Sequence, residues 1–411
     1  MTGTTGAWIT TTEAAQRLGV KRATLYAYVS RGLLRSERRP GQQESLFERA
    51  QIDAMASATR APGGPQPLLR FRSIATAVSS QADGDLLYRG VPLADVVAIG
   101  SLDEAAGVVL GSLGAQPVPP AQVPVGVDLS ALPLERRVPV AVQLLAAADP
   151  FSSDADPDRV RASALSTVRA AVGLVARRSV LAPTTRPRTG DMSWDRAPAT
   201  GSSRDRPVDL AALTLEALGG DPASSADVAV LRVLLVALLD HGLTASTVAA
   251  RVAASTRAGL HDCLCAAYAA MAGPLHGAAP IAAHGLLAEG TDPSVLVARS
   301  LRERGGVAGF GHFLYPDGDP RADVVLNALW RRRGTTRLRR RVEALAALVA
   351  DRTGALPNID LASAAVLHAL RLPAESGEVV FQVARSVGVA AHVVEEYAEE
   401  PLRWRGRDPG A

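Results

Sequence analysis

The sequence predicts a mainly helical protein in which a small N-terminal helical unit precedes a larger helical body. Hydrophobic residues make up 47% of the 411 residues, but aromatic residues only 4%. The core must therefore be built from Ala, Leu and Val, which favours closely packed helices over a β-sandwich. Ala/Leu/Val-rich helical segments dominate from Leu93 onward. A Pro/Gly-rich stretch, residues 61–67, has the composition of a linker between the two parts.

The charge of the chain is unevenly placed. The formal net charge is +3, yet residues 1–60 hold nine Lys/Arg against five Asp/Glu, so the N-terminal unit carries the positive excess. Cys263 and Cys265 lie in an apolar helical stretch and are expected to be buried thiols, not disulfide or metal ligands. No apolar run reaches the ~20 residues that span a bilayer. We expect a cytoplasmic protein with no membrane contact and no metal.

Residues 1–60 predict two short helices around a tight turn. Thr10 and Glu13 have capping-box spacing, and Gly19 is placed to end the first helix. Leu25 and Val29 of the second helix can pack back on the first. The turn at Pro40–Gly41 can form a small wing, and a last helix is expected to start near Phe47.

This N-terminal pattern resembles a winged helix-turn-helix domain of the MerR or excisionase-like kind. The second helix of such a motif enters the major groove of DNA, and cations meet the phosphates. The candidate DNA contacts are Lys21, Arg22, Thr24 and Arg38. The alternative is a small helical domain that docks on the larger helical body and touches no nucleic acid.

After a linker at 61–70, residues 77–90 have the character of strands joined by a turn. Helices are expected at 209–218 and 226–239, on the far side of a Pro/Thr/Arg/Ser/Gly stretch at 182–207 that predicts a long exposed loop.

Three Gly/Pro-rich motifs carry the candidate chemistry. Gly273-Pro274-Leu275-His276-Gly277 puts a histidine in a turn between apolar runs. Gly309-Phe310-Gly311-His312 is followed by Asp319-Pro320-Arg321, which places an imidazole and a guanidinium on one loop. Leu356-Pro357-Asn358-Ile359-Asp360 ends on a carboxylate before a helical stretch. Such a set could hold a small carboxylate beside an acid–base group.

These motifs, in this order, resemble the citrate synthase family. Further matches are Leu87-Tyr88-Arg89-Gly90, Asp240 through Thr247, and Phe381 through His392, so the resemblance covers roughly residues 71–407. It implies a two-domain helical fold for residues 71–411. The large domain would comprise about 71–255 and 361–411, and the small domain about 256–360.

The resemblance also implies roles for individual residues. Asp360 would be the base that removes a proton next to the thioester of an acyl-CoA, His276 the partner of the enolate oxygen, and His312 the donor to the ketone of oxaloacetate. His241, Arg321 and Arg385 would bind oxaloacetate. A further arginine would reach across a homodimer. The family's Arg-Pro-Arg motif is only partly matched here, so Arg405 is the first choice and Arg403 the alternate.

One departure concerns the acyl-CoA. Pro316 stands where family members often carry a basic residue for the CoA phosphates, so Arg302 or Arg304 would have to serve.

Two hypotheses about function follow. The first is an acyltransferase that condenses acetyl-CoA or propionyl-CoA with oxaloacetate, giving citrate or 2-methylcitrate and CoA, with no cofactor beyond the acyl-CoA co-substrate. The complete set of His276, His312 and Asp360 favours it. The second is a transcriptional regulator that senses an oxo acid or acyl-CoA through its citrate synthase-like domain and binds double-stranded DNA through residues 1–60. The N-terminal motif and Pro316 favour that one.

Overall fold

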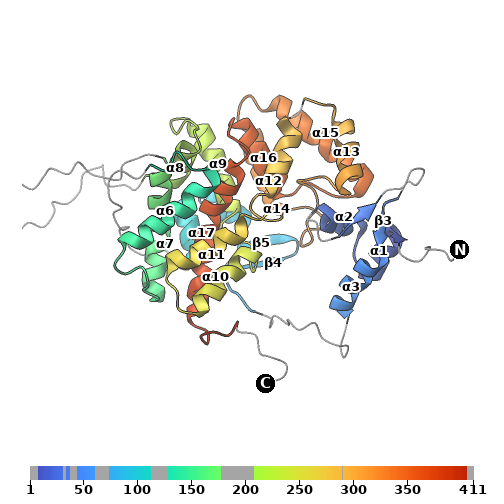
Figure 1. Cartoon of the computed structure of the whole chain (residues 1–411). Coiled ribbons are helices and arrows are strands. Elements are labelled where there is room, and N and C mark those ends of the chain that lie inside the picture. Colours follow the sequence, from blue (N-terminus) through green and yellow to red (C-terminus); the bar gives the residue numbers. More distant parts are fainter. Residues whose placement is uncertain are drawn as a thin grey trace, which may run out of the picture.

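The computed structural model describes residues 8–30, 34–37, 44–60, 74–112, 128–176, 208–288 and 290–404 (Figure 1). Helices dominate these residues, which confirms the predicted class. Two separate hydrophobic cores are present. The smaller belongs to the N-terminal unit and the larger to the body.

The N-terminal unit is a helix-turn-helix with a three-stranded antiparallel sheet of order β1-β3-β2. Its elements in chain order are β1 (Trp8–Thr10), α1 (Thr11–Leu18), α2 (Arg22–Ser30), β2 (Ser36–Glu37), β3 (Leu46–Glu48) and α3 (Arg49–Arg60). The Thr10 side chain accepts from the Glu13 backbone, and the Glu13 carboxylate accepts from the Thr10 backbone, so the predicted capping box is present. Gly19 ends α1 in the left-handed region, at φ 66°, as expected.

Leu25, Val29, Phe47 and Ile9 share the small core. Phe47 lies in β3, opposite Ile9, and is fully buried. The last helix therefore starts at Arg49, two residues later than the sequence suggested, because Phe47 packs best from a strand. β2 and β3 pair antiparallel on either side of the predicted wing turn, whose tip lies outside the described residues, as does Arg38.

Strands also form at the start of the body. β4 (Ser79–Ala82), β5 (Asp85–Tyr88) and β6 (Val91–Pro92) make an antiparallel sheet in chain order. β4 and β5 lie within the range 77–90 that predicted strands and a turn, and β6 lies just beyond it. Leu86 and Tyr88 point one way into the large core, as the two-residue period of a strand requires.

Helices make up the rest of the body and fall into two groups in Figure 1. The first group consists of α4 (Leu93–Ala98), α5 (Leu102–Leu110), α6 (Leu134–Ala148), α7 (Pro157–Val175), α8 (Leu210–Ala217), α9 (Ser225–Ala237), α10 (Ala245–Ser255), α11 (Leu260–Met271) and α17 (Ser376–Tyr397). The second consists of α12 (Ala279–Ala288), α13 (Pro293–Arg304), α14 (Pro320–Trp330), α15 (Thr336–Thr353) and α16 (Ile359–Ala369). The helices expected at 209–218 and 226–239 are α8 and α9. The predicted linker and the loop at 182–207 lie outside the described residues.

Helix α17 is the centre of the body. It packs against α5, α6, α7, α9, α10, α11, α12 and α16, and nearly all of its residues are buried. Cys263 lies in the same core and Cys265 packs at its edge; both are free thiols. Within the described ranges, no helix is long and apolar enough to cross a membrane.

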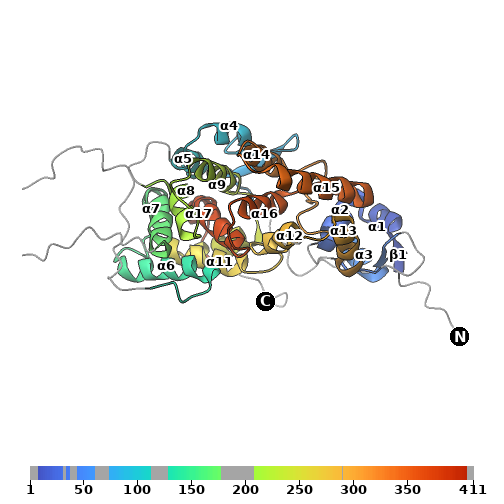
Figure 2. The same cartoon turned by 90° about the horizontal axis from the view of Figure 1, so that it is seen from above.

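The N-terminal unit lies beside α13 and α15, at the end of the body away from α6 and α7 (Figures 1 and 2). Helix α2 is the element that contacts α15.

A glycine lets α17 approach the loop after α9. A Cβ on Gly388 would lie 2.4 Å from the Leu239 carbonyl oxygen and 2.5 Å from Asp240 Oδ1. We expect Gly388→Ala to lower the free energy of unfolding by about 1–3 kcal/mol, because it overpacks a buried contact. Urea unfolding followed by circular dichroism measures this.

Gly285 in α12 provides the matched control, since a Cβ there meets nothing within 4 Å. Gly285→Ala should be neutral or stabilise by about 0.5–1 kcal/mol, because it only removes backbone freedom from a helix. Equal effects of the two substitutions would contradict the close approach at Gly388.

Candidate active site

A cavity of about 310 Å³ lies between the two helix groups and collects the residues that the sequence proposed for catalysis and oxaloacetate binding. Six of the seven line it: His241, His276, His312, Arg321, Asp360 and Arg385. The seventh, Arg405, lies outside the described residues. The structure thus brings together side chains that are up to 144 positions apart in the chain, while their roles stay predictions.

Each of these residues sits at an end or turn of an element, except Arg385 within α17. His276 follows α11 in a turn, and His312 lies in the loop between α13 and α14. Arg321 and Asp360 are second residues of α14 and α16. The first turn of a helix carries a partial positive charge, which favours the Asp360 carboxylate there.

The tautomer of His312 follows from its backbone contact. The Leu314 N–H donates to His312 Nδ1 over 3.1 Å. An accepting Nδ1 carries no hydrogen, so the ring hydrogen of the neutral imidazole is on Nε2. His312 is 5% exposed and can offer this Nε2–H to a carbonyl oxygen in the cavity.

Hydroxyl groups orient the other two histidines. His276 Nε2 lies 2.8 Å from Ser246 Oγ at the start of α10. His241 Nε2 lies 3.0 Å from the Tyr315 hydroxyl. The Ser246 contact is made through Nε2, and it fixes the orientation of the His276 ring.

Arg321 is held by a carboxylate two residues before it. Its Nε and Nη2 donate to Asp319 over 2.9 and 2.8 Å, and both side chains are buried. Burial by itself lowers the pKa of Arg321, but the charge and hydrogen bonds of Asp319 outweigh it, so the net pKa is raised. Asp319 also accepts from the Ile359 backbone N–H over 3.0 Å, which ties Arg321 to the turn that presents Asp360.

Asn358 joins the loop of His312 to helix α16. Its side-chain oxygen accepts from the Asp360 backbone, and its Nδ2 donates to the Gly311 carbonyl over 2.9 Å. Its own backbone N–H donates to Gly309. The relative position of His312 and Asp360 is therefore fixed through one amide side chain.

Arg385 is the exceptional charge in the site. It is 2% exposed, and its Nε and Nη1 have no hydrogen-bond partner among the described residues. Burial lowers its pKa, and the nearby negative charge of Asp240 opposes that shift. A guanidinium remains charged even so. Arg385 lines the cavity, and a buried cation with unsatisfied N–H groups beside a cavity is suited to a carboxylate ligand.

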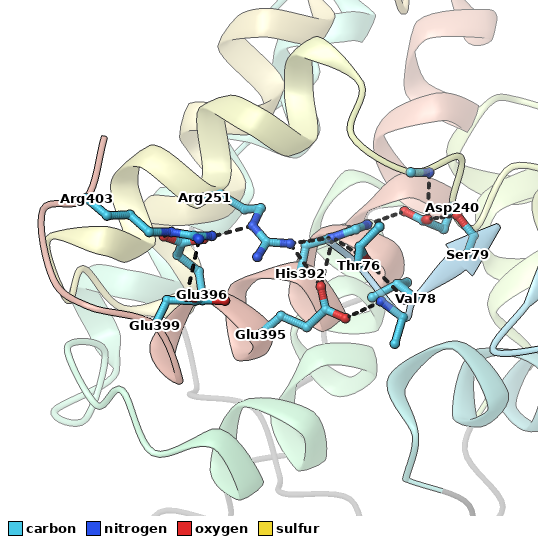
Figure 3. A network of polar contacts seen from close by, with 12 residues as sticks. Thr76, Val78, Ser79, Asp240, Arg251, His392, Glu395, Glu396, Glu399 and Arg403 are labelled. Carbon is cyan, nitrogen blue, oxygen red and sulfur yellow. Dashed lines mark hydrogen bonds and ion pairs between the residues drawn. The ribbon is translucent and has the colours of Figure 1, made fainter. Parts of the chain in front are cut away.

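Behind the cavity, a buried network of polar contacts anchors α17 (Figure 3). Arg251 donates to Glu396 over 2.8 Å and to Glu395 over 2.9 Å. His392 Nε2 lies 3.2 Å from Asp240 Oδ1, in an ion pair that is not aligned as a hydrogen bond. The other Asp240 oxygen accepts from Ser79 of β4 and from the Gly242 backbone. Asp240 directly precedes His241, so this network sets the position of a cavity histidine.

The charge balance of this network favours a protonated His392. Three carboxylates, Asp240, Glu395 and Glu396, face two guanidiniums, Arg251 and Arg403. Burial lowers the pKa of His392, but Asp240 and Glu395 outweigh it and the net pKa is raised. Arg251 Nη1, 3.2 Å from Nδ1, opposes protonation at that nitrogen. We favour the protonated form, because its positive charge offsets the fully buried negative charge of Asp240.

The same contacts act on the carboxylates. Burial raises the pKa of Asp240 and Glu395, but His392 and hydrogen bonds outweigh it and bring each to about 2.

The structure places the remaining candidates as follows. Arg304 lines the cavity, whereas Arg302 is exposed on the same helix and is not part of the lining. Arg403 turns back on its own chain and pairs with Glu396 and Glu399. Lys21 and Arg22 are exposed, and Thr24 is buried.

Sequence reasoning missed the residues that position the candidates. Asp319, Asn358, Ser246 and Tyr315 stand within the quoted motifs or beside them. Asn358 and Asp319 each precede a helix, and that capping position was the available signal. Nothing in the sequence linked Ser246 to His276 or Tyr315 to His241, because those contacts join distant segments.

The chain belongs to the citrate synthase family. The family model "Citrate synthase, C-terminal domain" matches residues 120–406, and the model "Helix-turn-helix domain" matches residues 8–60.

Individual relatives agree with this assignment. The chain is 31% identical to a citrate synthase of Haloferax volcanii, over 50% of this chain and 56% of the relative. It is 32% identical to a 2-methylcitrate synthase of Shewanella oneidensis, over 49% and 56%. The chain thus spans about half the length of these curated relatives. The citrate synthase of Thermoplasma acidophilum has the same fold, with a TM-score of 0.60 at 22% identity over 82% of this chain and 93% of that one.

The buried network makes a prediction about pH. A raised folded-state pKa of His392 means that its ion pairs stabilise fully below the unfolded pKa of 6.5 and are lost as pH rises through the folded pKa. The difference in unfolding free energy between wild type and His392→Asn should therefore be largest near pH 6 and shrink toward pH 9. Urea unfolding across this range measures it.

The control is His261→Asn. Burial lowers the pKa of His261, so its linkage has the opposite sign. The wild type should gain on this variant as pH rises from the folded pKa to the unfolded value of 6.5, and should show no further change up to pH 9. A wild-type advantage over His392→Asn that stayed constant from pH 6 to 9 would contradict a protonated His392.

Proposed function

We propose that this chain condenses an acyl-CoA with oxaloacetate and releases CoA, with citrate as the product from acetyl-CoA and 2-methylcitrate from propionyl-CoA. The observation that carries the proposal is the unpaired, buried guanidinium of Arg385 in a cavity that also holds Arg321, His312 and Asp360. An enclosed cation without a partner is costly to fold. It is explained if an anionic substrate completes the site.

In the proposed reaction, the Asp360 carboxylate takes a proton from the carbon next to the thioester carbonyl. His276 donates to the enolate oxygen while Ser246 contacts its Nε2. The enolate carbon then attacks the ketone carbon of oxaloacetate. His312 donates from Nε2 to the ketone oxygen, which becomes the hydroxyl of the product. Water hydrolyses the resulting thioester and frees CoA. The reaction so written needs no cofactor beyond its co-substrate.

Arginines supply the grip on the two substrates in this proposal. Arg385 and the remaining N–H groups of Arg321 bind the carboxylates of oxaloacetate, with His241 beside them. Arg405 of a second subunit supplies a third contact in a homodimer. Pro316 occupies the position where family members often carry a basic residue. In this proposal Arg304, which lines the cavity, binds the CoA phosphates instead.

The relatives support this chemistry without choosing the acyl group, since both citrate synthases and 2-methylcitrate synthases are among them. The Thermoplasma acidophilum enzyme was solved as a ternary complex with carboxymethyl coenzyme A and oxaloacetate. A cavity lined by Leu275, Ala279, Ala282 and Phe381 has apolar room for an acyl chain.

For residues 1–60 we propose contact with double-stranded DNA. The helix-turn-helix match and the local excess of positive charge support this role. It is compatible with catalysis by the body, because the two functions use different surfaces.

Catalysis is tested by the release of free thiol from acetyl-CoA and propionyl-CoA. We expect release only with oxaloacetate present, and a loss of about 10²–10⁴-fold for Asp360→Asn, the usual scale of a general base. Asp351→Asn changes an exposed carboxylate at the end of α15 and serves as control. A wild type that releases no thiol with either substrate would favour the regulator, which binds these ligands without turnover.

The role of Arg385 is tested by two opposite effects of Arg385→Met. Loss of a charge-assisted fork should raise KM for oxaloacetate by about 10–100-fold. The same change should raise the melting temperature of the unliganded protein, because it removes an unpaired buried charge.

Arg251→Met is the matched control for that substitution. Arg251 is 1% exposed, but it is paired with Glu395 and Glu396. Breaking a buried pair destabilises by about 3–5 kcal/mol. Equal destabilisation by Arg385→Met and Arg251→Met would show that Arg385 is a structural charge.

A further inference from the structure

The first observation is that α2 is covered by the body of its own chain. Lys21, the only lysine in the sequence, directly precedes α2 and places its Nζ 2.7 Å from Asp317 Oδ1. A Cβ on Gly354, at the end of α15, would lie 3.8 Å from the Ala23 Cβ. A Cβ on Gly305, at the end of α13, would lie 2.0 Å from Ser36 Oγ. The contact therefore runs along α2 and reaches the strand after it.

The second observation is which side of α2 is covered. Leu25 and Val29 face the small core of the N-terminal unit. With 3.6 residues per turn, Ala23 and Thr24 lie on a side of the helix turned away from that core. Thr24 is nevertheless only 7% exposed, and Ala23 is partly buried. Ala23 on this outward side meets α15 at Gly354, and Val29 approaches α13 at Gly305, so the body covers the outward side of α2 at Ala23 and also reaches its C-terminal end.

That same side is the one a helix-turn-helix needs for DNA. The second helix lies in the major groove, and its N-terminal residues reach the base edges. The groove is about 12 Å wide, and a helix with its side chains is about 10–12 Å across. A helix inserted there has no room for a second helix on its outward side. α15 and duplex DNA cannot both contact the side of α2 that carries Ala23.

The docking contact is weak enough to be displaced. The Lys21–Asp317 pair is 65% and 82% exposed, and exposed pairs of this kind contribute little and are screened by salt. The interface also encloses a cavity of about 300 Å³, lined by Arg22 and Tyr26 on one side and by Leu301 and Leu348 on the other. A partner that attracts Lys21 and Arg22 with closely spaced phosphates can compete with such a surface.

We infer that α2 has two mutually exclusive partners, the α13–α15 surface of its own chain and duplex DNA, so that the docked chain is closed to DNA. This inference rests on the DNA contact proposed above. Asp317 lies between His312 and Arg321, so the docked state is also tied to the loop that carries two residues of the candidate active site. The enzyme body is then the element that restrains the helix-turn-helix.

A disulfide lock tests the competition in the full chain. The 3.8 Å between Ala23 Cβ and a Cβ on Gly354 suits a disulfide. The double variant Ala23→Cys, Gly354→Cys is prepared in an oxidised and a reduced form. The affinity of each form for a labelled random-sequence duplex is measured by titration at low salt. Oxidation should weaken binding by about tenfold or more, because it removes the binding-competent state, and reductant should restore it. Cys263 and Cys265 interfere little, since burial raises the pKa of both thiols.

Gly354 has a positive φ of 74°, which a cysteine tolerates poorly. A second crosslink is therefore made in the wild-type protein, without substitutions. A carbodiimide joins an amine to a carboxylate in contact, and Lys21 carries the only side-chain amine. Wild-type protein should form a Lys21–Asp317 amide, identified by peptide mass spectrometry, and the joined form should lose DNA affinity like the oxidised variant.

Charge reversal tests the release of the docked state. Asp317→Lys repels Lys21 and should tighten DNA binding more than Glu343→Lys does. The latter changes the net charge equally, but its carboxylate pairs with Arg339 within α15. Any gain shared by both variants is a general effect of positive charge.

The outcomes separate the two proposals. If the locked forms bind duplex as tightly as the free forms, competition is overturned while the DNA contact stands. If neither the reduced variant nor Asp317→Lys binds duplex at low salt, the DNA contact itself is overturned and competition falls with it. Failure of wild-type protein to form the Lys21–Asp317 amide would contradict the docked state.

Discussion

The burial of charge on helix α17 is the constraint on which the rest of the structure depends. This helix runs through the centre of the body and carries Arg385, His392 and Glu396 in positions that water does not reach. Ionised groups in such a place need partners. His392 and Glu396 have them within the chain, in Asp240, Arg251 and Arg403. Arg385 lacks hydrogen-bond partners on two of its nitrogens, and it is the one that lines the cavity.

The ion pairs of His392 and Glu396 on α17 occupy the nearby charged groups, and this leaves two nitrogens of Arg385 without a hydrogen-bond partner among the described residues. Asp240 is held between His392, Ser79 and the Gly242 backbone, so the loop after α9 cannot swing its carboxylate onto Arg385. Gly388 lets that loop lie directly against the helix. The network in Figure 3 therefore supports the site by taking up the local negative charge, and it leaves Arg385 to a ligand.

On the side of the cavity formed by α14 and α16, Arg321 is also partly paired within the chain. Asp319 occupies two nitrogens of Arg321 and also binds the backbone at the start of α16. Asn358 ties the same helix to the loop of His312. Hydrogen bonds thus join the loop of His312, the start of α14 and the start of α16. Because Asp317 belongs to the loop between His312 and Arg321, the contact with α2 reaches these joined segments directly. A helix-turn-helix docked there contacts the loop that carries two residues of the candidate active site.

The sequence by itself determined the helical class, the boundary signals of the N-terminal unit and the set of cavity residues. These depend on local patterns: capping residues such as Thr10, a left-handed Gly19, apolar spacing along the helices, and motifs that resemble a known family. It missed the start of α3, since Phe47 is drawn into a strand by burial against Ile9. Only the tertiary structure decided which charges are paired and which are not. The pairing of Arg251 with Glu395 and Glu396, the contact of His392 with Asp240 and the covering of α2 all join segments that the chain separates, and the isolation of Arg385 depends on the same tertiary contacts. Pairing of buried charge depends on distance and on exclusion of water, and neither can be read from spacing along the sequence.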